Sequence, residues 1–183
     1  FATSGYNYFL GQHFTGNTIF ENTNSWNNGF PDIYREAIID YDFNTGIISD
    51  FEACNLTINS GKTLEIEPNQ SITIQSDVTV NGVLTVLHEG SLLMLHNDGL
   101  ITNNGEINIH KTTTQLKQYD YTYWSSPTAN ETTGSALANS EPGRIYEWHN
   151  INGWIAAGGA TTMNPGKGYI AMGSTAGTFP QTQ

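Results

Sequence analysis

The oxygen-bearing side chains of Asp40, Asp42 and Asn44 alternate along the chain and are followed by Gly46. Carboxylate and amide oxygens at such spacing are the ligands that calcium-binding loops use. The match to an EF-hand loop is imperfect, because that loop has glycine at its sixth position and Gly46 is the seventh residue from Asp40. Alternate residues of a strand also share one face, so the same side chains would equally suit the solvated side of an edge strand. We keep Asp40, Asp42 and Asn44 as candidate calcium ligands and expect no other cofactor.

Aromatic side chains gather in the last third of the chain, and Trp124, Trp148 and Trp154 are candidates for glycan binding. Sugar rings stack on exposed aromatic faces while nearby polar groups satisfy the hydroxyls. The alternative is that these rings fill the core of a small β-unit, since each buries on the order of 150–250 Å². The tyrosines of segment 119–123 alternate and share one face, which we expect to point inward.

A catalytic constellation is not recognisable in the sequence. Glu65 and Glu67 could act as a carboxylate pair on an acidic glycan, but no cluster of Lys or Arg accompanies them. The histidines at 88, 96 and 110 lack metal-binding spacing and are read as isolated surface residues. We therefore predict that the chain is not an enzyme. The alternative function is a carbohydrate-binding module, or a non-catalytic part of a polysaccharide-active secreted enzyme.

Composition restricts the partners further. Six Lys and Arg against seventeen Asp and Glu give a formal net charge of −11 at pH 7, which repels phosphate backbones, so nucleic acid is an improbable partner. No apolar run approaches the roughly 20 residues of a bilayer-spanning helix, so no membrane span is expected. The single cysteine, Cys54, excludes a disulfide within the chain.

Short apolar alternations recur in the middle of the chain at a step of about 22 residues, which is typical of a solenoid. The repeated triplets are Leu56–Ile58, Val78–Val80 and Leu100–Thr102. Each is followed by an Asn/Gly turn, where Asn can bond its counterpart in the next coil and Gly can adopt positive φ. A parallel β-helix explains a constant step, because each short strand pairs with its copy one coil later. A meander of short hairpins is the competing interpretation, since Asn81-Gly82 is also a good hairpin turn.

The sequence therefore predicts an all-β fold, in which a short parallel β-helix (solenoid) precedes an aromatic-rich β-sandwich-like unit. We divide the chain into a strand/turn segment and cap at 1–36, the β-helix-like repeat at 37–115 and the aromatic unit at 116–183. Strand candidates in the last region are 119–123, 144–148 and 168–172, where residues alternate with period two. The last region ends without an obvious terminal element, so we expect the chain to be a piece of a larger protein.

Five blocks in this order carry a family resemblance: Trp26–Pro31, Ala37–Asn44, Asn55–Gly61, Tyr119–Pro127 and Met163–Ile170. The series resembles modules of large cell-surface proteins exported by the type IX secretion system of Bacteroidota, including adhesin-like proteins of gliding flavobacteria. The resemblance implies an extracellular or cell-surface location, contact with the secretion machinery during export, and a role in adhesion or gliding. Its expected partners are an extracellular surface or glycan, or neighbouring modules of the same protein. It implies no reaction. From these expectations we predict a structural and adhesive module that acts as a stalk or display element.

Overall fold

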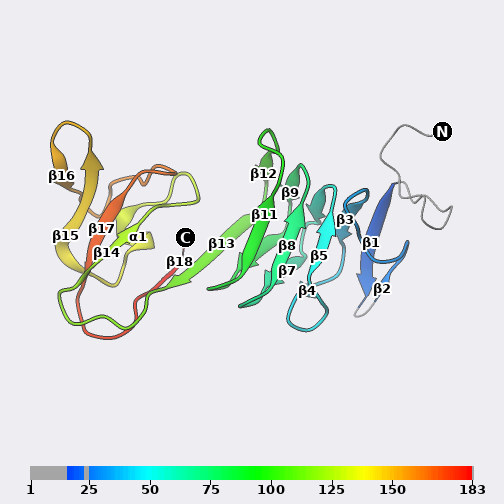
Figure 1. The fold of residues 1–183 in the computed structure, drawn as a ribbon, viewed down its shortest axis with the longest axis horizontal. Helices are drawn as coiled ribbons and strands as arrows, with labels where there is room; N and C mark the ends of the chain where they lie inside the picture. Colours follow the sequence, from blue (N-terminus) through cyan, green and yellow to red (C-terminus); the bar gives the residue numbers. More distant parts are fainter. Residues whose placement is uncertain (1–15, 23–24, 183) are drawn as a thin grey trace. The chain divides into compact units, whose positions relative to one another are not determined.

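The computed structural model describes residues 16–22 and 25–182, whose regular secondary structure is almost entirely β-strand with one short helix. They include a β-solenoid of about four turns, alongside further sheets. The predicted fold class is thereby confirmed. Two compact units divide the chain, one ending at Asn108 and the other beginning at Ile109 (Figure 1). Of the predicted N-terminal cap, positions 1–15 and 23–24 lie outside the described residues.

Three sheets run along the first unit, and each contains one strand from successive coils. The first sheet has the order β12 (Ile101–Asn103), β9 (Val78–Val80), β6 (Leu56–Ile58), β3 (Glu36–Ile39), β1 (Asn17–Asn22), β2 (Ser25–Trp26). The second contains β13 (Glu106–Thr112), β10 (Val83–Val86), β7 (Thr63–Ile66) and β4 (Phe43–Asn44). The third contains β11 (Ser91–Met94), β8 (Ser71–Ile74) and β5 (Phe51–Ala53). Apart from β1 with β2, the strand pairs among β1 to β12 run parallel, as a β-helix requires.

Registers between coils agree with the predicted repeat until the last coil. Leu56 pairs with Val78, but Val78 pairs with Ile101 and not with Leu100. The predicted register of the last triplet is therefore wrong by one residue. The step from Val78 to Ile101 is one residue longer than the step from Leu56 to Val78. As the Asp77 amide does to Asn55 one coil earlier, the Leu100 amide donates a hydrogen bond of 2.9 Å to the Asp77 carboxylate. This bond holds Leu100 in the turn before the strand, where its side chain is exposed.

The core of the first unit consists of the inward members of each strand. Period-two alternation turns every second side chain inward, and stacking the coils joins these side chains into one column. The buried aliphatic members include Ala37, Ile39, Leu56, Ile58, Leu64, Ile66, Ile72, Ile74, Val78, Val80 and Leu84. At the N-terminal end the column consists of aromatic rings. The ring centroid of Phe43 lies 4.9 Å from that of Phe20 and 5.3 Å from that of Phe51. Trp26 on β2 contacts all three rings and covers this end.

Close approach of neighbouring coils explains the glycines at one corner. A Cβ at Gly82 would overlap the carbonyl oxygen of Lys62, and one at Gly105 would overlap the carbonyl oxygen of Gly82. Neither glycine has positive φ, unlike Gly61, so our explanation of these turns by left-handed backbone holds only at Gly61. The predicted contact between corner asparagines is present, because Asn104 Nδ2 donates to Asn81 Oδ1 at 3.0 Å.

The second unit contains a four-stranded antiparallel sheet with the order β14 (Tyr121–Trp124), β17 (Tyr169–Gly173), β15 (Ser140–His149) and β16 (Gly153–Ala156). The three predicted strands in this region are present. The single-turn helix α1 (Thr133–Ala136) lies in the segment between β14 and β15, and Thr132 caps its N-terminus. One side of the sheet packs on a small core formed by Ala136, Leu137, Ile145, Ala157, Met163, Tyr169 and Ala171. A further strand, β18 (Pro180–Thr182), pairs antiparallel with the end of β13.

Substitution of Gly82 by alanine tests the close approach of the coils. Because the added methyl group meets backbone and not a movable side chain, we expect Gly82→Ala to lower the free energy of unfolding by about 1–3 kcal/mol. Chemical unfolding followed by circular dichroism measures the change. Gly158→Ala is the control, since nothing lies within 4 Å of a Cβ there. Equal stability of the two variants would contradict the close approach.

Candidate binding surface

The predicted calcium ligands Asp40 and Asp42 are exposed, and each contacts the next coil of the solenoid. Asp40 Oδ1 accepts a hydrogen bond of 2.9 Å from Asn59 Nδ2, and Asp42 Oδ1 accepts one of 2.9 Å from the Thr63 amide. Both carboxylates thus satisfy donors of the following coil. Their positions are explained by the stacking of coils without a bound ion.

Asn44 is the third predicted ligand, and its amide group is fully engaged. Its Nδ2 donates to Glu65 Oε1 at 2.7 Å and to Glu67 Oε1 at 2.8 Å, while its Oδ1 accepts from the Gly46 amide at 2.8 Å. Glu65 and Glu67, the carboxylate pair considered for catalysis, are half-buried and converge on Asn44. Among the described residues no group of three or more His, Cys, Asp or Glu is arranged to hold a metal ion. Calcium binding at Asp40, Asp42 and Asn44 stays a prediction.

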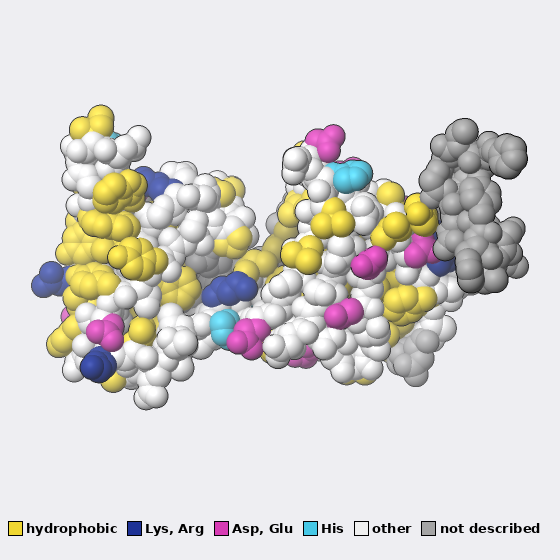
Figure 2. Space-filling model, in the orientation of Figure 1, with side chains coloured by type: hydrophobic (Ala, Val, Ile, Leu, Met, Phe, Trp, Pro, Cys, Tyr) yellow, Lys and Arg dark blue, Asp and Glu magenta, His cyan; other side chains and the backbone are white. Residues whose placement is uncertain are grey.

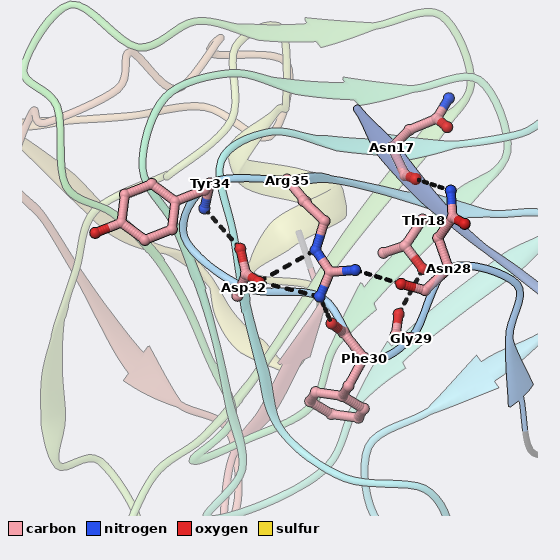
Figure 3. A network of polar contacts seen from close by, with 8 residues as sticks. All are labelled: Asn17, Thr18, Asn28, Gly29, Phe30, Asp32, Tyr34 and Arg35. Carbon is pink, nitrogen blue, oxygen red and sulfur yellow. Dashed lines mark hydrogen bonds and ion pairs between the residues drawn. The ribbon is translucent and has the colours of Figure 1, made fainter. Parts of the chain in front are cut away.

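A buried arginine that the sequence analysis did not single out organises the loop before β3. The Arg35 side chain is 7% exposed and forms an ion pair with Asp32 at 3.0 Å. Its other guanidinium hydrogens bond the carbonyl oxygens of Asn28 and Phe30 (Figure 3). Thr18 on β1 completes the attachment by donating to the Gly29 carbonyl at 2.6 Å. One side chain therefore fixes the loop at 28–32.

Beside this loop the surface is hollowed, with a cavity volume of about 400 Å³. Its lining includes the acidic residues Asp32, Asp50 and Glu52 and the ring of Phe30. Asp32 is paired with Arg35, and Asp50 accepts a hydrogen bond of 3.0 Å from the Ser71 amide. Two of the three carboxylates thus have structural partners.

The largest group of exposed aromatic residues covers the outer side of the four-stranded sheet. It comprises Tyr121 and Tyr123 on β14, Tyr146 and Trp148 on β15, and Trp154 on β16, and we call it the aromatic face. Tyr123 is 81% exposed, Trp148 48% and Trp154 38%. Hydrophobic side chains gather over this sheet in the space-filling view (Figure 2). Monomeric proteins rarely leave such a patch uncovered without a function.

Strand pairing brings these rings together from distant parts of the sequence. Trp148 lies directly opposite Trp154, and their ring centroids are 5.2 Å apart at an interplanar angle of 69°. The ring of Tyr123 lies 6.2 Å from that of Trp154 at 53°, and Tyr121 lies 6.3 Å from Tyr146 at 55°. The Trp148 and Trp154 rings meet edge to face, while the other two pairs are tilted.

Arg144 adds a positive charge to the aromatic face. Arg144, Tyr146 and Trp148 occupy alternate positions of β15. Their side chains therefore lie on the side of the sheet opposite to the buried Ile145. The pKa of the guanidinium is raised above its usual value. The main causes are a hydrogen bond and a charge interaction with Tyr146, followed by a charge interaction with Tyr121. The cation therefore lies among tyrosine hydroxyls at the surface.

Two expectations about aromatic residues are corrected by this arrangement. The tyrosines of segment 119–123 point outward, because the core packs on the other side of the sheet. Trp124 alternates with them and packs against that core, with its Nε1 donating to Thr122 Oγ1 at 2.6 Å. Of the three predicted glycan-binding tryptophans, the structure therefore brings together Trp148 and Trp154 and places Trp124 on the opposite side.

A family model matches residues 13–183, which is nearly the whole chain, and is described as a domain of unknown function, DUF8693. The chain belongs to this family. Neither a curated protein nor a solved structure matches it. In this DUF8693 member, no helix among the described residues is long and apolar enough to cross a membrane.

Substitution of Arg35 by lysine tests whether the guanidinium fork fixes the loop in this DUF8693 member. A lysine keeps the charge but cannot bond Asp32 and two carbonyl groups in one plane, so we expect unfolding free energy to fall by about 2 kcal/mol. Chemical denaturation measures it. The exposed Lys111→Arg is the control and should change stability by less than about 0.5 kcal/mol. An Arg35→Lys protein as stable as the control would refute the role of the fork.

Proposed function

We propose that the chain is a non-catalytic adhesive module of a secreted or cell-surface protein, in which the aromatic face binds a glycan and the solenoid serves as a spacer. The observation that carries the proposal is the aromatic face itself. Five Tyr and Trp side chains share the outer side of one sheet, and Tyr123 is 81% exposed. Packing in the protein core does not explain why these rings lie on the outer side of the sheet.

The chemistry of these side chains suits sugars. The C–H side of a sugar ring stacks on an aromatic face, and tyrosine hydroxyls and the indole N–H groups bond its hydroxyls. Trp148 and Trp154 each have an apolar body and a polar tip at the surface. Burying such rings against a ligand removes apolar area from water, which favours binding.

Ring geometry favours a single glycan chain over a flat crystalline surface. The measured angles of 53° to 69° between neighbouring rings prevent them from lying in one plane. A flat polymer surface would contact the edges of some rings and the faces of others. A flexible oligosaccharide can turn its successive units toward each ring.

The solenoid supports the spacer part of the proposal. Its strands pair in parallel from coil to coil, so the coils cooperate along one axis. The resemblance to type IX-exported surface modules of Bacteroidota supports export, display at the cell surface and neighbouring modules of the same protein as partners. No chemical step is needed for this function, and Glu65 and Glu67, the carboxylates considered for catalysis, both bond Asn44.

Alanine substitutions on the aromatic face test the proposal. We expect Tyr123→Ala and Trp148→Ala each to weaken binding of an oligosaccharide about tenfold, because each removes an exposed stacking surface. A glycan array of acidic and neutral oligosaccharides identifies the ligand, and titration calorimetry with the strongest binder measures the affinities.

The matched control is Tyr34→Ala, which removes a 46% exposed tyrosine from the first unit. It should bind like the unaltered protein. The proposed function is wrong if the unaltered protein binds no oligosaccharide of the array. It is also wrong if the Tyr123 and Trp148 variants bind as tightly as the control.

A further inference from the structure

We infer that the aromatic face selects an acidic glycan, whose carboxylate or sulfate group pairs with Arg144. This inference rests on the proposed function and names the class of its ligand. Arg144, Tyr146 and Trp148 occupy alternate positions of β15, so the cation and the rings lie on the same side of the sheet. Four residues of strand span about 13 Å, which is the length of a short oligosaccharide.

The guanidinium of Arg144 is available to a ligand. The ion pairs of the described residues join Arg35 to Asp32 and Lys167 to Glu147, and neither involves Arg144. Its neighbours are the hydroxyls of Tyr146 and Tyr121, and the residue is exposed. A guanidinium presents several N–H donors in one plane and matches a carboxylate or sulfate with two parallel hydrogen bonds.

Charge distribution makes this placement specific. The chain carries a formal charge of −11, so its surface as a whole repels an anionic polymer. From Ile145 onward on β15, and on the paired parts of β14, β16 and β17, the outward positions are uncharged: Tyr121, Tyr123, Tyr146, Trp148, Trp154, Ala156, Ile170 and Met172. Glu141 lies at the other end of β15, before the irregularity in register between Ser140 and Ile145. An anionic sugar that lies along the paired part of the sheet therefore reaches Arg144 without meeting a carboxylate at these positions.

Matched pairs of oligosaccharides test the inference on the full chain. Oligogalacturonate is compared with its methyl ester, and an oligosaccharide of a sulfated galactan with its desulfated form. We expect each acidic member to bind roughly fivefold more tightly than its neutral counterpart, with the preference falling as salt is raised. Arg144→Gln should bind both members equally. Lys111→Gln makes the same change of net charge outside this sheet and should keep the preference.

The outcomes separate this inference from the proposed function. If the unaltered protein binds both members equally, or Arg144→Gln keeps the preference, the acidic ligand is wrong while glycan binding stands. If no oligosaccharide of the array or of these pairs binds, the proposed function fails and the inference fails with it. Equally tight binding of poly-glutamate, or self-association abolished by Trp148→Ala, would identify a protein as the occupant and overturn the inference.

Discussion

Parallel register between successive coils determines the structure of the first unit. Each strand pairs with the equivalent strand of the next coil, so side chains at equivalent positions come into contact. Hydrogen bonds at separations of 19, 21 and 23 residues join Asp40 to Asn59, Asn44 to Glu65 and Asn104 to Asn81. The acidic and amide residues that resemble metal ligands in the sequence thus lie where the stacking needs acceptors and donors. The same register brings backbones so close at Gly82 that a side chain does not fit.

Much of the fold could be predicted because its signals are local. Alternation such as Leu56-Thr57-Ile58 identifies the inward positions, and the recurring step identifies the coils. The last register was missed because the step from Val78 to Ile101 is one residue longer than the step from Leu56 to Val78, and Leu100 is as apolar as the strand residue that follows it. The loop at 28–32 was also beyond prediction, since Arg35 fixes it through carbonyl groups whose positions depend on the folded chain.

Part of the placement of the candidate site residues could be predicted from the sequence. Alternation correctly shows that Tyr121 and Tyr123 share one side of a strand and that Trp124 lies on the other. It does not show which side is covered, because that depends on Leu137 and Met163, which reach the sheet from distant segments. The pairing of Trp148 with Trp154 follows from a hairpin between adjacent strands. The sequence signals the strand of Trp148 but not that of Trp154, and only the packing of the core reveals that both are exposed.

The indole signals of the four tryptophans provide the most direct test of the account, because they report on every relevant surface at once. Nuclear magnetic resonance spectra are recorded as the oligosaccharide that binds most tightly is added. We predict that the indole signals of Trp148 and Trp154 shift with increasing ligand, while those of Trp26 at the solenoid end and Trp124 at the core side stay in place. Shifts confined to Trp26, or to Trp124, would contradict the assignment of binding to the aromatic face.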